Sequence, residues 1–101
     1  METQFYIVFT LKTYSGLESF AKFFIGNNRK KAGAIFRQLK GTGKINEKNI
    51  LYIDLMETKA GLPVNLNMIT CTLNQLGDNC KIITKELFKS KNLESFFTDI
   101  P

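Results

Sequence analysis

A run of basic residues in the middle of the chain is the first feature with chemical potential. Residues 29–48 hold seven basic residues and one acid, Glu47, so this window carries a net charge of +6, whereas the whole chain of 101 residues carries +5. Positive surfaces of this kind attract phosphates and other polyanions. One predicted function is therefore sequence-nonspecific nucleic-acid binding through the basic segment 29–48, by six of its side chains: Arg29, Lys30, Lys31, Arg37, Lys40 and Lys44.

A second candidate site uses the starts of two expected helices. If the strands before these helices run parallel, both helix N-termini open at one edge of the sheet, where free N–H groups and the helix dipole bind small anions. The simpler interpretation is that the asparagines there cap helices and the lysines are solvated. The side chains that would gather at this small-anion site are Asn27, Asn28, Arg29, Lys30, Lys59 and Asn65.

Enzyme chemistry has little support in this sequence. The chain has no histidine and only two cysteines, Cys71 and Cys80, which removes the commonest general base and leaves too few ligands for most zinc sites. Asp54 lies in an apolar stretch, where an exposed carboxylate is ordinary and a buried one needs a partner or a raised pKa. We predict a non-catalytic protein without cofactor or metal, with both thiols reduced and packed.

Hydrophobic periodicity predicts the elements that must position these side chains. We expect strands over 4–13, 17–25, 50–58 and 80–89 and helices over 28–39 and 65–76. Two stretches have a second interpretation, because 17–25 also fits helical spacing and 64–68 also alternates as a strand. The predicted fold is one α+β domain over 1–101, a two-layer sandwich in which a mixed four-stranded sheet carries two helices on one face, in the order ββαβαβ.

The composition and the predicted elements favour a function in protein–protein association. The chain is 44% hydrophobic with nine phenylalanines, enough for one core, and its longest uncharged stretch is too polar to span a membrane. Its start lacks the pattern of a secretory signal, so we expect a cytoplasmic protein. The uncharged helix expected at 65–76, the open sheet face and the edge strand expected at 80–88 favour self-association, as a homodimer, or a protein partner. In the tail, 91–101, Phe96 and Phe97 are expected to pack back on the domain.

Two segments carry a resemblance to known proteins. Residues 24–29, FIGNNR, with LKG at 39–41, and residues 73–83, LNQLGDNCKII, resemble a small bacterial protein family of unknown function. The resemblance covers most of the chain. It implies a small bacterial cytosolic domain, and it implies neither an activity nor a catalytic residue.

Overall fold

The fold consists of one sheet and two helices. The computed structural model describes residues 3–45 and 47–91. The elements are β1 (Gln4–Thr13), β2 (Gly16–Phe24), α1 (Arg29–Gln38), β3 (Leu51–Lys59), β4 (Leu62–Thr70) and α2 (Leu73–Ser90). Among the described residues, no helix has both the length and the apolar composition that a membrane crossing requires.

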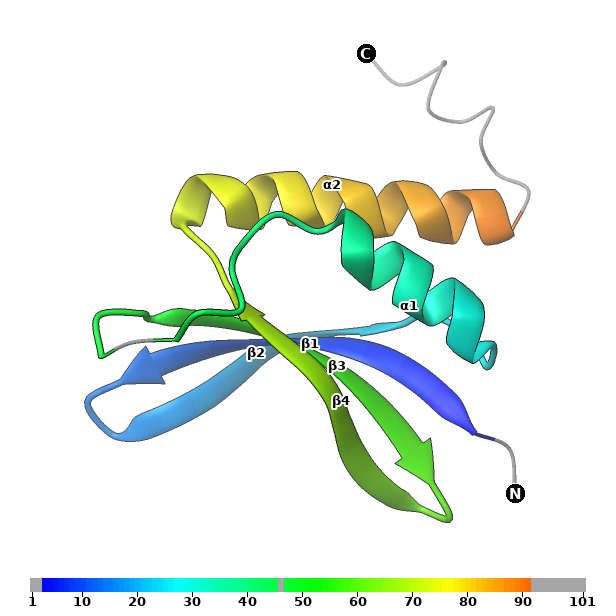
Figure 1. The fold of residues 1–101 in the computed structure, drawn as a ribbon, viewed down its shortest axis with the longest axis horizontal. Coiled ribbons are helices and arrows are strands. Elements are labelled where there is room, and N and C mark those ends of the chain that lie inside the picture. Colours follow the sequence, from blue (N-terminus) through cyan, green and yellow to red (C-terminus); the bar gives the residue numbers. More distant parts are fainter. Residues whose placement is uncertain (1–2, 46, 92–101) are drawn as a thin grey trace.

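The four strands form one antiparallel sheet in the order β2-β1-β3-β4, and both helices cover the same face of it (Figure 1). This confirms the predicted α+β sandwich of two layers, the strand at 17–25 and the central positions of the strands at 4–13 and 50–58. The mixed sheet and the order ββαβαβ were wrong, because the order is ββαββα and no described strand pair is parallel. The chain therefore repeats a ββα unit.

The second half of the chain differs most from the prediction. Where we expected a helix over 65–76 and a strand over 80–89, the chain forms β4 and then α2. Ala60 and Gly61, both with positive φ, make the two-residue turn that returns β3 into β4. Thr72 then starts α2 through a capping box, in which its side chain accepts from the Gln75 N–H while the Gln75 side chain accepts from the Thr72 N–H.

The core lies between the sheet and the helices. Alternation along β1 and β3 sends every second side chain to the helix-covered face, where Phe5, Ile7 and Phe9 of β1 and Leu51, Ile53 and Leu55 of β3 are at most 7% exposed. α1 and α2 each contribute an apolar stripe against this layer. The buried core residues on these four elements include Phe5, Ile7, Phe9, Ile53, Leu55, Ala32, Phe36 and Ile83.

Hydrogen bonds between the Asn79 side chain and the backbone of Lys40 hold the connector from α1 to β3 against α2. Asn79 of α2 is fully buried, and its side-chain amide accepts from the Lys40 N–H at 2.7 Å and donates to the Lys40 carbonyl at 2.8 Å. Gly41, which the sequence suggested as the left-handed end of the helix, lies beyond the C-cap Leu39. A side chain at Gly41 would collide with the Thr70 carbonyl oxygen, so glycine is needed there for close backbone approach.

Candidate functional site

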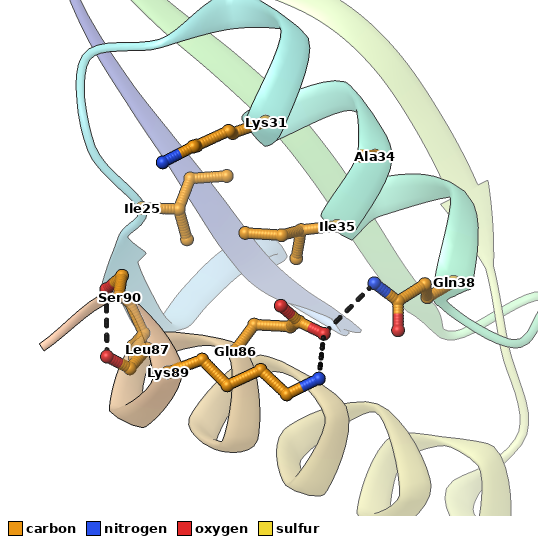
Figure 2. A pocket seen from close by; sticks show the side chains of 9 residues that line it. All are labelled: Ile25, Lys31, Ala34, Ile35, Gln38, Glu86, Leu87, Lys89 and Ser90. Carbon is orange, nitrogen blue, oxygen red and sulfur yellow. Dashed lines mark hydrogen bonds and ion pairs between the residues drawn. The ribbon is translucent and has the colours of Figure 1, made fainter. Parts of the chain in front are cut away.

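The basic window does not form one surface. Asn28 caps α1 by accepting from the Lys31 N–H at 2.9 Å, and this fixes where the side chains of the first turn point. Lys31 lies on the side of α1 that faces α2 and helps to line a cleft of about 290 Å³, shown in Figure 2. In that cleft Glu86 of α2 accepts from Gln38 at 3.2 Å and pairs with Lys89 at 3.5 Å. Glu86 therefore belongs to α2, and not to a last strand as expected.

Three other basic side chains lie on the opposite side of α1. Arg29, Lys30 and Arg37 line a cleft of about 370 Å³ between α1 and the outer strand β4. Arg29 also pairs with Glu57 of β3 at 3.6 Å. The Glu57 side chain is only 9% exposed, so its carboxylate lies on the interior side of the ion pair and the Arg29 guanidinium lies on the solvent side. This cleft is where the structure brings sequence-predicted cations together.

The remaining cations of the window are placed elsewhere. Lys40 forms an ion pair with Asp78 of α2 at 3.1 Å, and Lys44 is exposed in the connector, where its backbone N–H donates to Thr42. The six side chains predicted as one polyanion-binding set are thus divided between two sides of α1 and the connector.

The expected small-anion site is not assembled. Because all strand pairs are antiparallel and α2 begins at Leu73, the two helix starts lie at opposite ends of the helix layer (Figure 1). Asn65 pairs with Met56 in the sheet and faces away from the helices. Lys59 lies at the end of β3, and Asn28 acts as a helix cap. The assumption of parallel strands was therefore wrong, and with it the shared edge.

The helix-free face of the sheet carries apolar side chains interspersed with polar and charged ones. By strand register it presents Val8 of β1, Phe24 of β2, Met56 of β3 and Met68 of β4. Val8, Met56 and Met68 are half-buried, and Phe24 is 53% exposed. We refer to these four residues as the open-face cluster.

The charged strand residues on this face are engaged within the domain. The Lys22 ammonium lies 4.2 Å from the centre of the Tyr6 ring. The Asp54 carboxylate accepts from the Asn65 amide at 2.8 Å. Burial raises the pKa of Asp54, and the hydrogen bond from Asn65 offsets part of that rise. At the end of β1, Lys12 donates to the Glu47 carbonyl oxygen at 3.4 Å.

Both edge strands are irregular, which disfavours pairing with another sheet. β2 departs from regular register where Phe9 and Thr10 of β1 meet it, and β4 departs where Leu55 and Met56 of β3 meet it. β4 also contains Pro63, which has no N–H to donate. Irregular register and proline are the devices by which natural sheets protect their edges. The edge strand expected at 80–88 was wrong, since these residues are helical.

The two cysteines are free and half-buried, and both side chains contact the core. Burial raises the pKa of both thiols, and the nearby Cys80 raises that of Cys71 further. The neutral thiol is therefore favoured, as expected for packed rather than reactive cysteines. No group of three or more metal-ligating side chains occurs within residues 3–45 and 47–91.

Sequence reasoning missed two polar residues that organise these surfaces. Glu57 was not singled out, although an acid among the alternating apolar residues of 51–57 is a signal of a buried partner. Asn79 lay between the helix expected at 65–76 and the strand expected at 80–89, and it was not singled out. No local pattern identifies it, because its partner Lys40 is 39 residues away.

Comparison with known proteins found no matching family model, no matching curated protein and no matching solved structure. The resemblance of residues 24–29, 39–41 and 73–83 to a small bacterial family therefore stays a prediction.

Proposed function

We propose that this protein is a non-catalytic binding protein that associates with a second copy of itself through the helix-free face of its sheet. The observation that supports the proposal is a set of exposed and half-buried apolar side chains on that face, whose charged neighbours are engaged within the domain. The open-face cluster is apolar, while the charged strand residues Lys12, Lys22 and Asp54 each already have a contact within the domain. Depletion of available charge together with exposed aromatic and methionine side chains is typical of interface cores.

A dimer of this kind has a defined geometry. Two sheets that pack face to face lie about 10 Å apart, with their strands about 30° from parallel. A two-fold axis between them brings the same four residues from each copy to the interface. The result is four layers, helix, sheet, sheet and helix, with α1 and α2 outermost. The edges of the sheets stay unpaired, in keeping with the irregular register of β2 and β4.

Light scattering coupled to size-exclusion chromatography tests the proposal. The native chain is expected to elute as a dimer that dissociates on dilution. Phe24→Lys and Met68→Lys each place a charge in the open-face cluster, and each is expected to give a monomer with unchanged circular dichroism. The matched control is Leu73→Lys, because Leu73 is 75% exposed at the start of α2, away from this face. Leu73→Lys should remain dimeric.

Two outcomes contradict self-association. A native chain that stays monomeric at every accessible concentration excludes the homodimer and leaves a different protein as the partner. If the native chain is dimeric and all three variants weaken the dimer equally, the interface does not lie on the helix-free face. The cytoplasmic location expected from the sequence is part of the same proposal, and cysteines that react as free thiols in freshly lysed cells would support it.

A further inference from the structure

We propose that the cleft between α1 and β4 is a binding site for a small phosphate monoester. This site lies on the helix side of the sheet, so it is independent of association through the open-face cluster. Of the six basic residues predicted to bind polyanions, which span 16 positions of the sequence, three line this cleft: Arg29, Lys30 and Arg37.

The charges around the cleft match a phosphate monoester. Arg29, Lys30 and Arg37 contribute three positive charges, and the nearby Glu57 that pairs with Arg29 contributes one negative charge. Within the described residues, no ion pair or hydrogen bond engages the side chains of Lys30 and Arg37. A phosphate monoester carries a charge of about −1.5 to −2 at neutral pH, which balances the remaining two positive charges. Guanidinium groups bind phosphate oxygens through paired N–H donors.

Gly33 allows the positive charges to concentrate. The Arg37 Nη1 atom lies 3.3 Å from the position that a Cβ of residue 33 would occupy. Arg37 therefore folds back by one helical turn, toward Arg29 and Lys30, across the space that a side chain would fill. Glycine inside a helix destabilises it relative to alanine. Here the missing side chain opens the path along which the guanidinium reaches the other two cations.

The walls of the cleft favour a ligand with an apolar or planar body. Phe36 and Leu55 are 4% and 5% exposed and form an apolar floor together with the half-buried Leu66. Asn67 of β4 lines the far wall, and its side-chain oxygen accepts from the Met68 N–H, which leaves its NH₂ group as a hydrogen-bond donor at the cleft. The volume of about 370 Å³ lies at the lower end of the range for small-molecule sites, about 300 to 1,000 Å³.

The test uses adenosine monophosphate, inorganic phosphate and adenosine as probes in isothermal titration at constant ionic strength. Adenosine monophosphate is expected to bind best, phosphate more weakly and adenosine least. Lys30→Gln and Arg37→Gln are each expected to weaken monophosphate binding by about tenfold, since a hydrogen bond to a charged group is lost. Lys31→Gln is the matched control, because it removes the same charge from the same helix turn but lies in the other cleft. The affinity of Lys31→Gln for the monophosphate should stay within about twofold of the native value, because Lys31 is separated from the site.

Gly33→Ala separates a binding role of this glycine from a purely structural one. The added methyl group is expected to raise the melting temperature by a few degrees through helix propensity. It is also expected to weaken monophosphate binding, because Arg37 must shift away. Unchanged binding in Gly33→Ala would contradict the role given to the folded-back guanidinium.

Three outcomes would overturn the proposal. The first is that neither monophosphate nor phosphate binds the native chain. The second is that Lys31→Gln loses as much affinity as Arg37→Gln, which indicates diffuse attraction rather than a site. The third is that a single-stranded oligonucleotide binds far more tightly than the monophosphate and loses affinity equally on neutralisation of each of the six basic residues. That result would favour the nucleic-acid function expected from sequence.

Discussion

Apolar side chains lie on both faces of the sheet, but the two faces differ in how those side chains are covered. On the helix-covered face, Phe9 and Ile53 are at most 1% exposed because α1 and α2 pack on them. On the helix-free face, Val8 and Met56, which come from the same two strands, are half-buried and lie beside residues of the neighbouring strands. One strand therefore contributes to the core on one side and to a potential interface on the other.

The two faces also differ in the partners of their polar side chains. On the helix-covered face, polar groups join distant segments or line the rim, as Asn79 does toward Lys40 and Glu57 toward Arg29. On the helix-free face, Asp54 and Asn65 bond to each other across two adjacent strands. Burial without partners is costly, so the buried groups must be paired in the isolated domain, whereas an open face can keep apolar surface for association.

The largest expected effect comes from comparing one residue type on the two faces. Phe9→Ala should lower the free energy of unfolding by about 3 to 5 kcal/mol, because it leaves a cavity under the helices. Phe24→Ala should cost about 1 kcal/mol or less at low protein concentration, because Phe24 is half exposed. Urea denaturation of both variants measures this. Equal losses would show that the helix-free face is as well packed as the core.

Asn79→Ala should have the next largest effect. It removes two hydrogen bonds and leaves the Lys40 N–H and carbonyl without partners in a partly buried position. The expected loss is about 2 to 3 kcal/mol in the free energy of unfolding. Asn74→Ala, an exposed position in the first turn of the same helix, is the control and should change stability little. Hydrogen exchange at Lys40 should rise in the first variant and stay unchanged in the second.

The smallest effect concerns pH and the helix-free face. Burial raises the pKa of Asp54 above its ordinary value of 3.8, so folding favours the protonated carboxyl. That contribution is fully present below pH 3.8 and is lost as the pH rises through the raised pKa, which makes the ionised Asp54 mildly destabilising at neutral pH. Asp54→Asn should therefore stabilise the protein slightly at about pH 7, and the gain should shrink toward about pH 4.

Asp78→Asn is the control for this pH dependence. Asp78 is exposed and pairs with Lys40, so neutralising it should give no gain at neutral pH. A larger gain from Asp54→Asn at acidic than at neutral pH would contradict the sign derived for Asp54.

The elements β1, α1 and β3 could be predicted because the local signals of each agree. In β1 the side chains alternate, Asn28 can cap a helix, and the apolar residues Ala32 and Phe36 repeat at helical spacing. β3 has the same clear alternation over 51–57. In each of these segments the period of the hydrophobic pattern and the residues at the ends of the element favour one structure.

The second half could not be predicted in the same way because two periods overlap. Leu62, Leu66, Ile69, Leu73 and Leu76 have helical spacing, but they belong to β4 and α2, and the spacing continues across the boundary between them. A more informative local signal was available, since Thr72 followed by Gln75 is the pattern of a capping box, and Leu76, Cys80, Ile83 and Leu87 continue a helical stripe.

By itself, the sequence determined the composition of this protein and the local preference of its segments: an α+β fold with a basic window, a strand hairpin at the start and an amphipathic helix after Asn28. Tertiary structure alone decided which cations share a cleft and which face of the sheet stays open. The physical reason is distance along the chain. Contacts such as Arg29 with Glu57 and Asn79 with Lys40 join residues 28 and 39 positions apart, so they depend on how the elements pack and no local propensity specifies them.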